Sequence, residues 1–264
     1  MRRLDDVAGF PLAIDPQTYR LISTAVLPEP EVRSLGAMRP VLHTPECSGP
    51  AELYWMYRRA GPSEVQRRLR ARGLRFDLTV LRPGTLAGEF IKTFGHVHPP
   101  AADGWPYPEL YQVLAGRAWF LLQREASSQD DSAGRVEVRL IAAEAGDCAL
   151  VPPGFGHVTI NVGNEPLVLA NWVADAFASD YEPFRRRRGA AVYVLAAPEG
   201  DSGGEPHVVP NPHYPVPPVV ERVAPPSLAA LGLGYDREPI FAAACRQPDA
   251  FVFLVEPSQR PDLF

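Results

Sequence analysis

A succession of short segments with alternating polarity, each closed by a tight turn, is the feature that most constrains the fold of this chain. From Leu74 the sequence reads LRFDLTVLRPG, EFIKTFGHVH, PELYQVLAGRAWFLLQ, RVEVRLIAA and then a run broken by PPG and GNEP. Alternation of apolar and polar residues is typical of β-strands, and proline and glycine mark the turns between them. Thirty prolines and 21 glycines leave little room for long helices. The pattern predicts an all-β barrel or sandwich.

The rest of the chain predicts two appendages to this barrel and no second domain. Residues 1–50 have weak periodicity and several prolines, so we expect an N-terminal arm of extended segments. We assign residues 51–200 to the barrel. Residues 201–264 begin with a proline-rich stretch, which predicts an extended, polyproline-like C-terminal tail that packs on the barrel.

Three local features carry their own expectations. A short helix is predicted between Ser63, as its N-cap, and Gly73, as the residue that follows its end. The polar segment ASSQDDSAG, residues 126–134, predicts a loop. The alternation in Ala250–Val255 predicts one more strand.

Composition and charge argue against several classes of protein. The net charge of −5 does not suit nucleic-acid binding, and the run Arg185–Arg188 is expected to be a solvated surface stretch. Cys47, Cys148 and Cys245 are widely spaced and form no C-x-x-C pair, which favours neither disulfides nor structural zinc. The N-terminal residues lack the apolar core of a signal peptide, and no apolar run approaches about 18 residues. We therefore expect a soluble, cytoplasmic protein that binds neither nucleic acid nor membranes.

Four residues predict a metal site. His96 and His98 are two positions apart, so on a strand their side chains point to the same face. Glu109 begins another predicted strand, and His157 follows a VPPG turn. Three imidazoles and one carboxylate suit Fe, Mn, Co, Ni, Cu or Zn better than Ca or Mg. The set predicts one divalent transition metal.

The spacing around His157 resembles a known motif. Gly146, Pro152, Gly154, His157 and Asn161 match G(X)5PXG(X)2H(X)3N, the second motif of the cupins, at every fixed position. The pair His96-x-His98, together with Glu109, six residues and Gly116, resembles the first cupin motif, except that ten residues separate His98 from Glu109 where three or four are common. The inserted PPAADGWPYP is expected to loop out. The resemblance implies a double-stranded β-helix, or jelly-roll, barrel.

A closer resemblance follows from longer blocks. TVLRPGTLAGEFIKTFGHVH, PELYQVLAGRAWFLLQ, VPPGFGHVTINVGNEPLVLANWVAD and VVPNP are similar to the cupin-type, or archaeal-type, glucose-6-phosphate isomerases over roughly residues 30–215. The resemblance implies a homodimer that interconverts glucose 6-phosphate and fructose 6-phosphate with Fe, Mn, Ni or Zn. It implies His96, His98, Glu109 and His157 as metal ligands, and Glu109 is placed to act as the catalytic base.

The same resemblance implies which residues bind the substrate. Thr79, Thr93 and Gly95 occupy positions that help to hold the phosphate, whereas Tyr54 and Tyr111 line the sugar site. Trp172 stands where the family has a tyrosine that contacts the substrate, so we expect Trp172 in the site. Since no arginine cluster is evident near the motif, backbone N–H groups and hydroxyls are expected to bind the phosphate, and Glu89 and Lys92 to form a surface pair.

Three other functions fit the same residues. Trp172 could stack on another sugar, which favours an isomerase or epimerase of a different sugar or sugar phosphate. Iron held by histidine and glutamate with open positions can activate O₂, as in a cupin dioxygenase. A non-catalytic, sugar-binding cupin could also keep the metal.

Overall fold

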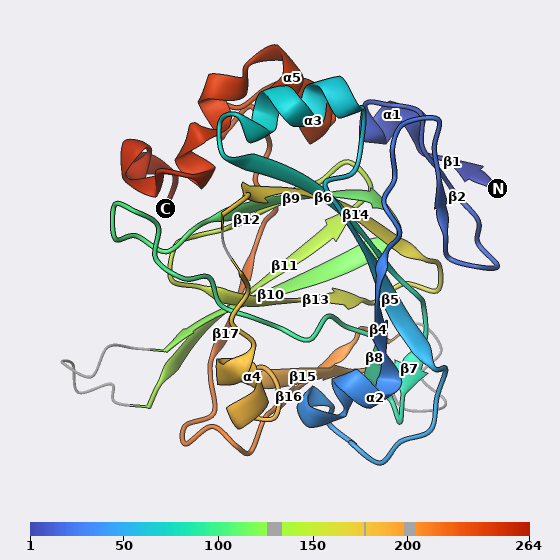
Figure 1. Ribbon diagram of the computed structural model, residues 1–264. Helices are drawn as coiled ribbons and strands as arrows, with labels where there is room; N and C mark the ends of the chain where they lie inside the picture. The colour runs from blue at the N-terminus through green and yellow to red at the C-terminus, as the bar shows by residue number, and fades with distance from the viewer. Residues whose placement is uncertain (126–133, 177, 198–203) are drawn as a thin grey trace.

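The computed structural model describes residues 1–125, 134–176, 178–197 and 204–264. Two β-sheets that face each other form its centre, with helices at two opposite ends of the view (Figure 1). The predicted polar loop at residues 126–134 lies outside the described residues, apart from Gly134. The arrangement is the all-β cupin barrel that the sequence predicts.

The two central sheets contain most of the strands. The larger sheet has, in spatial order, β12 (Cys148–Val151), β9 (Glu109–Ala115), β14 (Leu167–Ala174), β6 (Leu74–Leu81), β5 (Glu52–Arg58) and β4 (Glu31–Ser34). The facing sheet has β13 (Gly156–Asn161), β10 (Arg117–Glu125), β11 (Val136–Glu144) and β17 (Val220–Val223). All of these neighbours are antiparallel except β11 and β17, which are parallel.

Smaller elements surround these sheets. A third sheet contains β16 (His207–Pro210), β15 (Val192–Leu195), β8 (Glu89–Phe90) and β7 (Thr85–Leu86), and a fourth contains β1 (Arg2–Arg3), β2 (Ala13–Ile14) and β3 (Leu21–Ile22). The helices are α1 (Asp5–Ala8), α2 (Leu35–Met38), α3 (Ser63–Arg70), α4 (Glu182–Arg186) and α5 (Ile240–Arg246). Short 3-10 turns are η1 (Arg39–Val41), η2 (Pro248–Leu254), η3 (Pro257–Gln259) and η4 (Pro261–Leu263). No helix in the described part of the chain is both long and apolar enough to cross a bilayer.

Apart from its edge strand β4, the six-stranded sheet is buried on both faces. Its inner face and the facing sheet enclose one apolar cluster, which includes Val113 and Leu169. Its outer face packs into a second apolar cluster, in which Trp172 meets residues of α5. Figure 1 shows α3, α5 and the C-terminal turns over this outer face. Because neighbouring strand residues point to opposite faces, β6, β9 and β14 place apolar side chains in both clusters.

The appendages are more structured than the sequence predicts. Within the N-terminal arm, β4 pairs with β5 and extends the large sheet. The C-terminal tail contains β16, β17 and α5, so it is not extended throughout as expected. The tail contributes Phe241, Phe251 and Leu254 to the outer cluster, which explains why it packs on the barrel.

Two local predictions are wrong. Ala250–Val255 belongs mainly to the 3-10 turn η2 and is not a strand. Pro248 is well suited to begin a helical turn, and Phe251 and Leu254, three residues apart, both reach the outer cluster. The predicted helix α3 does form, but it begins at Ser63 with Pro62 in the cap position, and no side chain caps it.

Candidate metal centre

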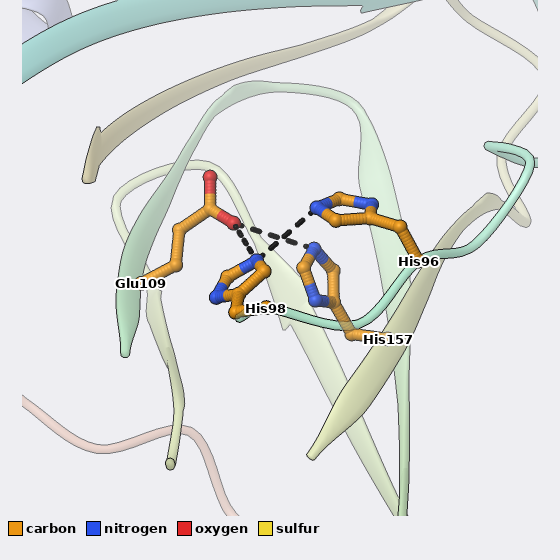
Figure 2. A group of neighbouring side chains, drawn as sticks. All are labelled: His96, His98, Glu109 and His157. Atoms are coloured by element: carbon orange, nitrogen blue, oxygen red, sulfur yellow. Dashed lines mark hydrogen bonds and ion pairs between the residues drawn. The ribbon is translucent and has the colours of Figure 1, made fainter. Parts of the chain in front are cut away.

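The four predicted ligands converge on one point between the two central sheets. One donor atom each from His96, His98, Glu109 and His157 lies within 4.8 Å of every other (Figure 2). Glu109 is the first residue of β9 and His157 lies in β13. The predicted convergence of these side chains is therefore confirmed.

His96 and His98 were expected on a regular strand. They lie instead in an extended segment outside the named strands. His96 exchanges two backbone hydrogen bonds with His157, at 3.3 and 3.0 Å, which fixes this segment against β13. Gly95 has φ of +85°, which interrupts a regular strand. A Cβ atom at this position would lie 2.5 Å from the ring of Phe184, so only glycine lets the segment approach.

The distances between donor atoms fit a single ion. His98 Nε2 lies 3.1 Å from His96 Nε2 and 3.2 Å from Glu109 Oε2, and His157 Nε2 lies 3.4 Å from the same oxygen. Metal bonds of roughly 2.0–2.2 Å separate neighbouring ligands by about 3 Å in octahedral and about 3.4 Å in tetrahedral geometry. Oε2 of Glu109 is also buried without a hydrogen-bond partner. A bound cation would satisfy a buried acceptor that faces three imidazoles.

Neighbouring groups orient the ligands. His98 donates from Nδ1 to the carbonyl oxygen of Tyr107 at 2.7 Å, which directs its Nε2 to the centre. Asn171 donates to Oε1 of Glu109 at 2.6 Å and leaves Oε2 for the ion. Such outer contacts fix ring orientation and ligand basicity in metal proteins.

The electrostatics favour the metal-binding protonation states. Burial lowers the pKa of His157 to about 4, and burial together with the neighbouring histidines lowers the pKa of His96 well below its ordinary value. Burial alone would raise the pKa of Glu109, but its interactions with His98 and His157 outweigh burial, so the net pKa is lowered. Burial and the charge of Glu109 raise the pKa of Tyr111 well above its ordinary value. Neutral imidazoles beside a carboxylate are ready to coordinate an ion.

Five of the six predicted substrate residues line a hollow beside this centre: Tyr54, Thr79, Thr93, Gly95 and Tyr111. Trp172 does not, and that prediction is wrong. It follows Asn171 on β14, so when Asn171 points to Glu109, Trp172 points to the outer face. There its Nε1 donates to the carbonyl oxygen of Ile240 at 3.0 Å.

Arginines also reach the hollow, contrary to the sequence analysis. Arg58 and Arg75 both line it, and both pair with the buried Asp77, each at 2.9 Å. The alternation of side chains along a strand could have identified both arginines. Arg58 shares a face of β5 with Tyr54, and Arg75 shares a face of β6 with Thr79.

The expected surface pair of Glu89 and Lys92 is also wrong. The two side chains form an ion pair inside the protein, with exposures of 1% and 5%. Glu89 also accepts a hydrogen bond from the backbone of His43 at 2.8 Å, and Lys92 lies over the ring of Tyr193. This pair therefore joins the N-terminal arm to the third sheet.

Comparison with known proteins identifies the family. The family model of glucose-6-phosphate isomerase (GPI) matches residues 41–210. The glucose-6-phosphate isomerase of Thermococcus gammatolerans is 33% identical over 58% of this chain and 70% of its own length, and that of Pyrococcus abyssi is 33% identical over 53% and 65%. The chain thus spans about two thirds of these relatives. Oxalate decarboxylase of Bacillus subtilis, a solved structure, aligns over 49% of this chain and 29% of its own, with 22% identity and a TM-score of 0.33.

Proposed function

Because the chain belongs to the glucose-6-phosphate isomerase family, we propose that it interconverts glucose 6-phosphate and fructose 6-phosphate at the candidate metal centre. The single observation that carries the proposal is the geometry of His96, His98, Glu109 and His157, whose donors meet beside a hollow lined by polar side chains. These four residues would hold one divalent transition metal, such as Fe, Mn, Ni or Zn. A bound ion would supply Lewis-acid polarisation of the substrate's carbonyl and hydroxyl oxygens.

Glu109 is the proposed catalytic base. Isomerisation of glucose 6-phosphate requires transfer of a hydrogen from C2 to C1 and movement of a hydroxyl proton from O2 to O1. Asn171 holds one carboxylate oxygen of Glu109, and the lowered pKa keeps the group ionised near neutral pH. An ionised, fixed carboxylate can accept the C2 proton and return it to C1.

The polar groups of the hollow provide donors for the substrate. Thr93 accepts a hydrogen bond from the backbone N–H of Thr159 at 2.9 Å, so its own hydroxyl proton is available to a phosphate oxygen. Tyr54 likewise accepts from the backbone N–H of Phe94 at 3.2 Å and can donate its proton. Thr93 and Tyr54, together with Thr79 and Gly95, form the proposed phosphate cradle. Tyr111 is the proposed contact of the sugar.

The hollow is small. Its volume of about 40 Å³ is room for roughly three water molecules. A sugar phosphate is larger, so the side chains at the mouth must rotate before it binds.

A coupled assay tests the proposed function. Metal-free protein should not convert fructose 6-phosphate, and added Mn or Fe should restore the conversion. Oxygen uptake without isomerisation would instead indicate the dioxygenase, and binding without turnover would indicate a sugar-binding cupin. In D₂O, a proton-transfer mechanism through Glu109 places deuterium in the product, whereas a hydride shift between C1 and C2 leaves the product unlabelled.

Assembly and location extend this proposal. The family resemblance supports a homodimer in the cytoplasm. A solution mass of about two chains, measured by light scattering, would agree with the dimer, and a mass of one chain would reject it.

A further inference from the structure

Arg33 packs against three aromatic rings that line the hollow, although it stands far from every motif. It belongs to β4 in the N-terminal arm, outside the matched residues 41–210, and it pairs with Tyr54 in the register of β4 and β5. Its guanidinium carbon lies 5.9 Å from the ring centre of Tyr54, 5.7 Å from that of Phe94 and 5.3 Å from that of Tyr181. All three rings line the hollow. Stacking on three rings holds the guanidinium in one place.

The charge of Arg33 is not neutralised within the described part of the chain. None of the ion pairs found there includes Arg33, and its Nε is buried without a hydrogen-bond partner. The other arginines nearby differ in this respect, because Arg58 and Arg75 share the carboxylate of Asp77. Arg33 therefore combines a free positive charge with at least one unused donor beside the hollow.

We propose that Arg33 is a specificity-determining residue that binds the phosphate of the sugar phosphate, an inference that rests on the proposed function. The guanidinium presents planar, forked donors that match phosphate oxygens, and a charged donor binds a dianion more strongly than hydroxyl groups do. One of its ring partners, Phe94, stands between Thr93 and Gly95 in the sequence, so Arg33 packs against the segment that carries both residues. Arg33 thus adds a charge beside the neutral donors of Tyr54, Thr79, Thr93 and Gly95.

The substitution Arg33→Met tests the proposal, because methionine keeps an unbranched side chain and removes the charge. The variant should raise KM for fructose 6-phosphate by about tenfold to a hundredfold, the range for loss of a charged hydrogen bond, and leave kcat nearly unchanged. Turnover of unphosphorylated fructose, however slow, should not change. Arg33→Lys should recover part of the affinity, because it restores the charge without the fork.

Arg82→Met is the matched control. Arg82 also stacks on a tyrosine, Tyr19, at 5.1 Å and also has a buried Nε without a partner, but Tyr19, unlike the ring partners of Arg33, does not line the hollow. Its replacement should leave KM for fructose 6-phosphate unchanged. Melting temperatures of both variants establish that each is folded.

Titration of inorganic phosphate into the metal-loaded protein separates this inference from the proposed function. If phosphate binds the native protein and binds Arg33→Met at least about tenfold more weakly, the assignment of Arg33 holds even if no isomerase activity is found. If the native protein isomerises fructose 6-phosphate and Arg33→Met retains its KM and its phosphate affinity, the assignment is overturned while the function stands. If the native protein binds no phosphate, the assignment is overturned.

Discussion

The two faces of the six-stranded sheet have different tasks. The inner face presents Glu109 and Asn171 to the metal centre, whereas the outer face presents Leu110 and Trp172 to an apolar cluster completed by the C-terminal tail. These two pairs are sequence neighbours, so one step along a strand moves a side chain from the candidate chemistry to packing. Substitutions one residue apart should therefore separate activity from stability, and the predictions below test that separation.

The largest effect is expected at the inner face, for His157→Ala. The variant removes one of four ligands from a buried site, so metal content and isomerase activity should fall together, by more than about a hundredfold in activity. Elemental analysis and the coupled assay measure both. Full metal content in a folded variant would show that the ligand set is wrong.

On the outer face, Trp172→Ala should reduce stability and leave the chemistry intact. The side chain is fully buried and packs against Phe76 and Phe241, so its loss should cost about 3–5 kcal/mol in the free energy of unfolding. Urea denaturation of the metal-loaded protein measures this cost. A large rise in KM for fructose 6-phosphate, with the variant still folded, would mean that Trp172 contacts the substrate after all.

Asn171, the neighbour of Trp172, should show the opposite pattern, with a large loss of metal affinity or activity and a small loss of stability. Asn171→Ala removes the hydrogen bond to Glu109, so metal affinity or activity should fall by about tenfold to a hundredfold. The loss of stability should be smaller than for Trp172→Ala, because fewer apolar contacts disappear. Metal titrations and urea denaturation of the two variants, carried out side by side, test the comparison directly. Equal metal affinities in both variants would contradict the separation of the two faces.

The inner face should also make the metal-free protein sensitive to acid. Burial lowers the pKa of His157 to about 4, whereas an unfolded chain titrates near 6.5. Between these values the unfolded state binds the additional proton, so stability falls as pH decreases from 6.5 to 4, by up to about 3 kcal/mol.

Urea midpoints of the metal-free protein across this pH range test the prediction. His157→Asn should flatten the dependence of the urea midpoint on pH. The control His207→Asn, at an exposed histidine, should leave that dependence unchanged. An unchanged dependence in His157→Asn would assign the acid sensitivity to other groups.

The sequence predicted what depends on local spacing. His96 and His98 on one face, Glu109 at a strand start and His157 after a turn require only a few neighbouring residues to be read correctly. Trp172 was misplaced because it was assigned by its position in the family resemblance, and β14 is buried on both faces, so its polarity pattern could not correct the assignment.

Long-range contacts explain the remaining omissions. Arg33 reaches the hollow because β4 pairs with β5, and nothing within residues 1–50 indicates that pairing. Similarly, the inserted segment before Glu109 loops out as expected, but its contacts were not predictable. Asp103 accepts a hydrogen bond from the backbone of Ser258, and Trp105 lies near Phe264, so the C-terminal tail supports the segment that contains Tyr107, the partner of His98.

The most direct measurement is a titration of chelator-treated protein with Mn, followed by isomerisation of fructose 6-phosphate. Four donors around one point predict that activity rises linearly and stops rising at one equivalent of metal per chain. Full activity in the chelated protein, verified to contain no metal, would contradict the proposed centre, and so would a requirement for several equivalents.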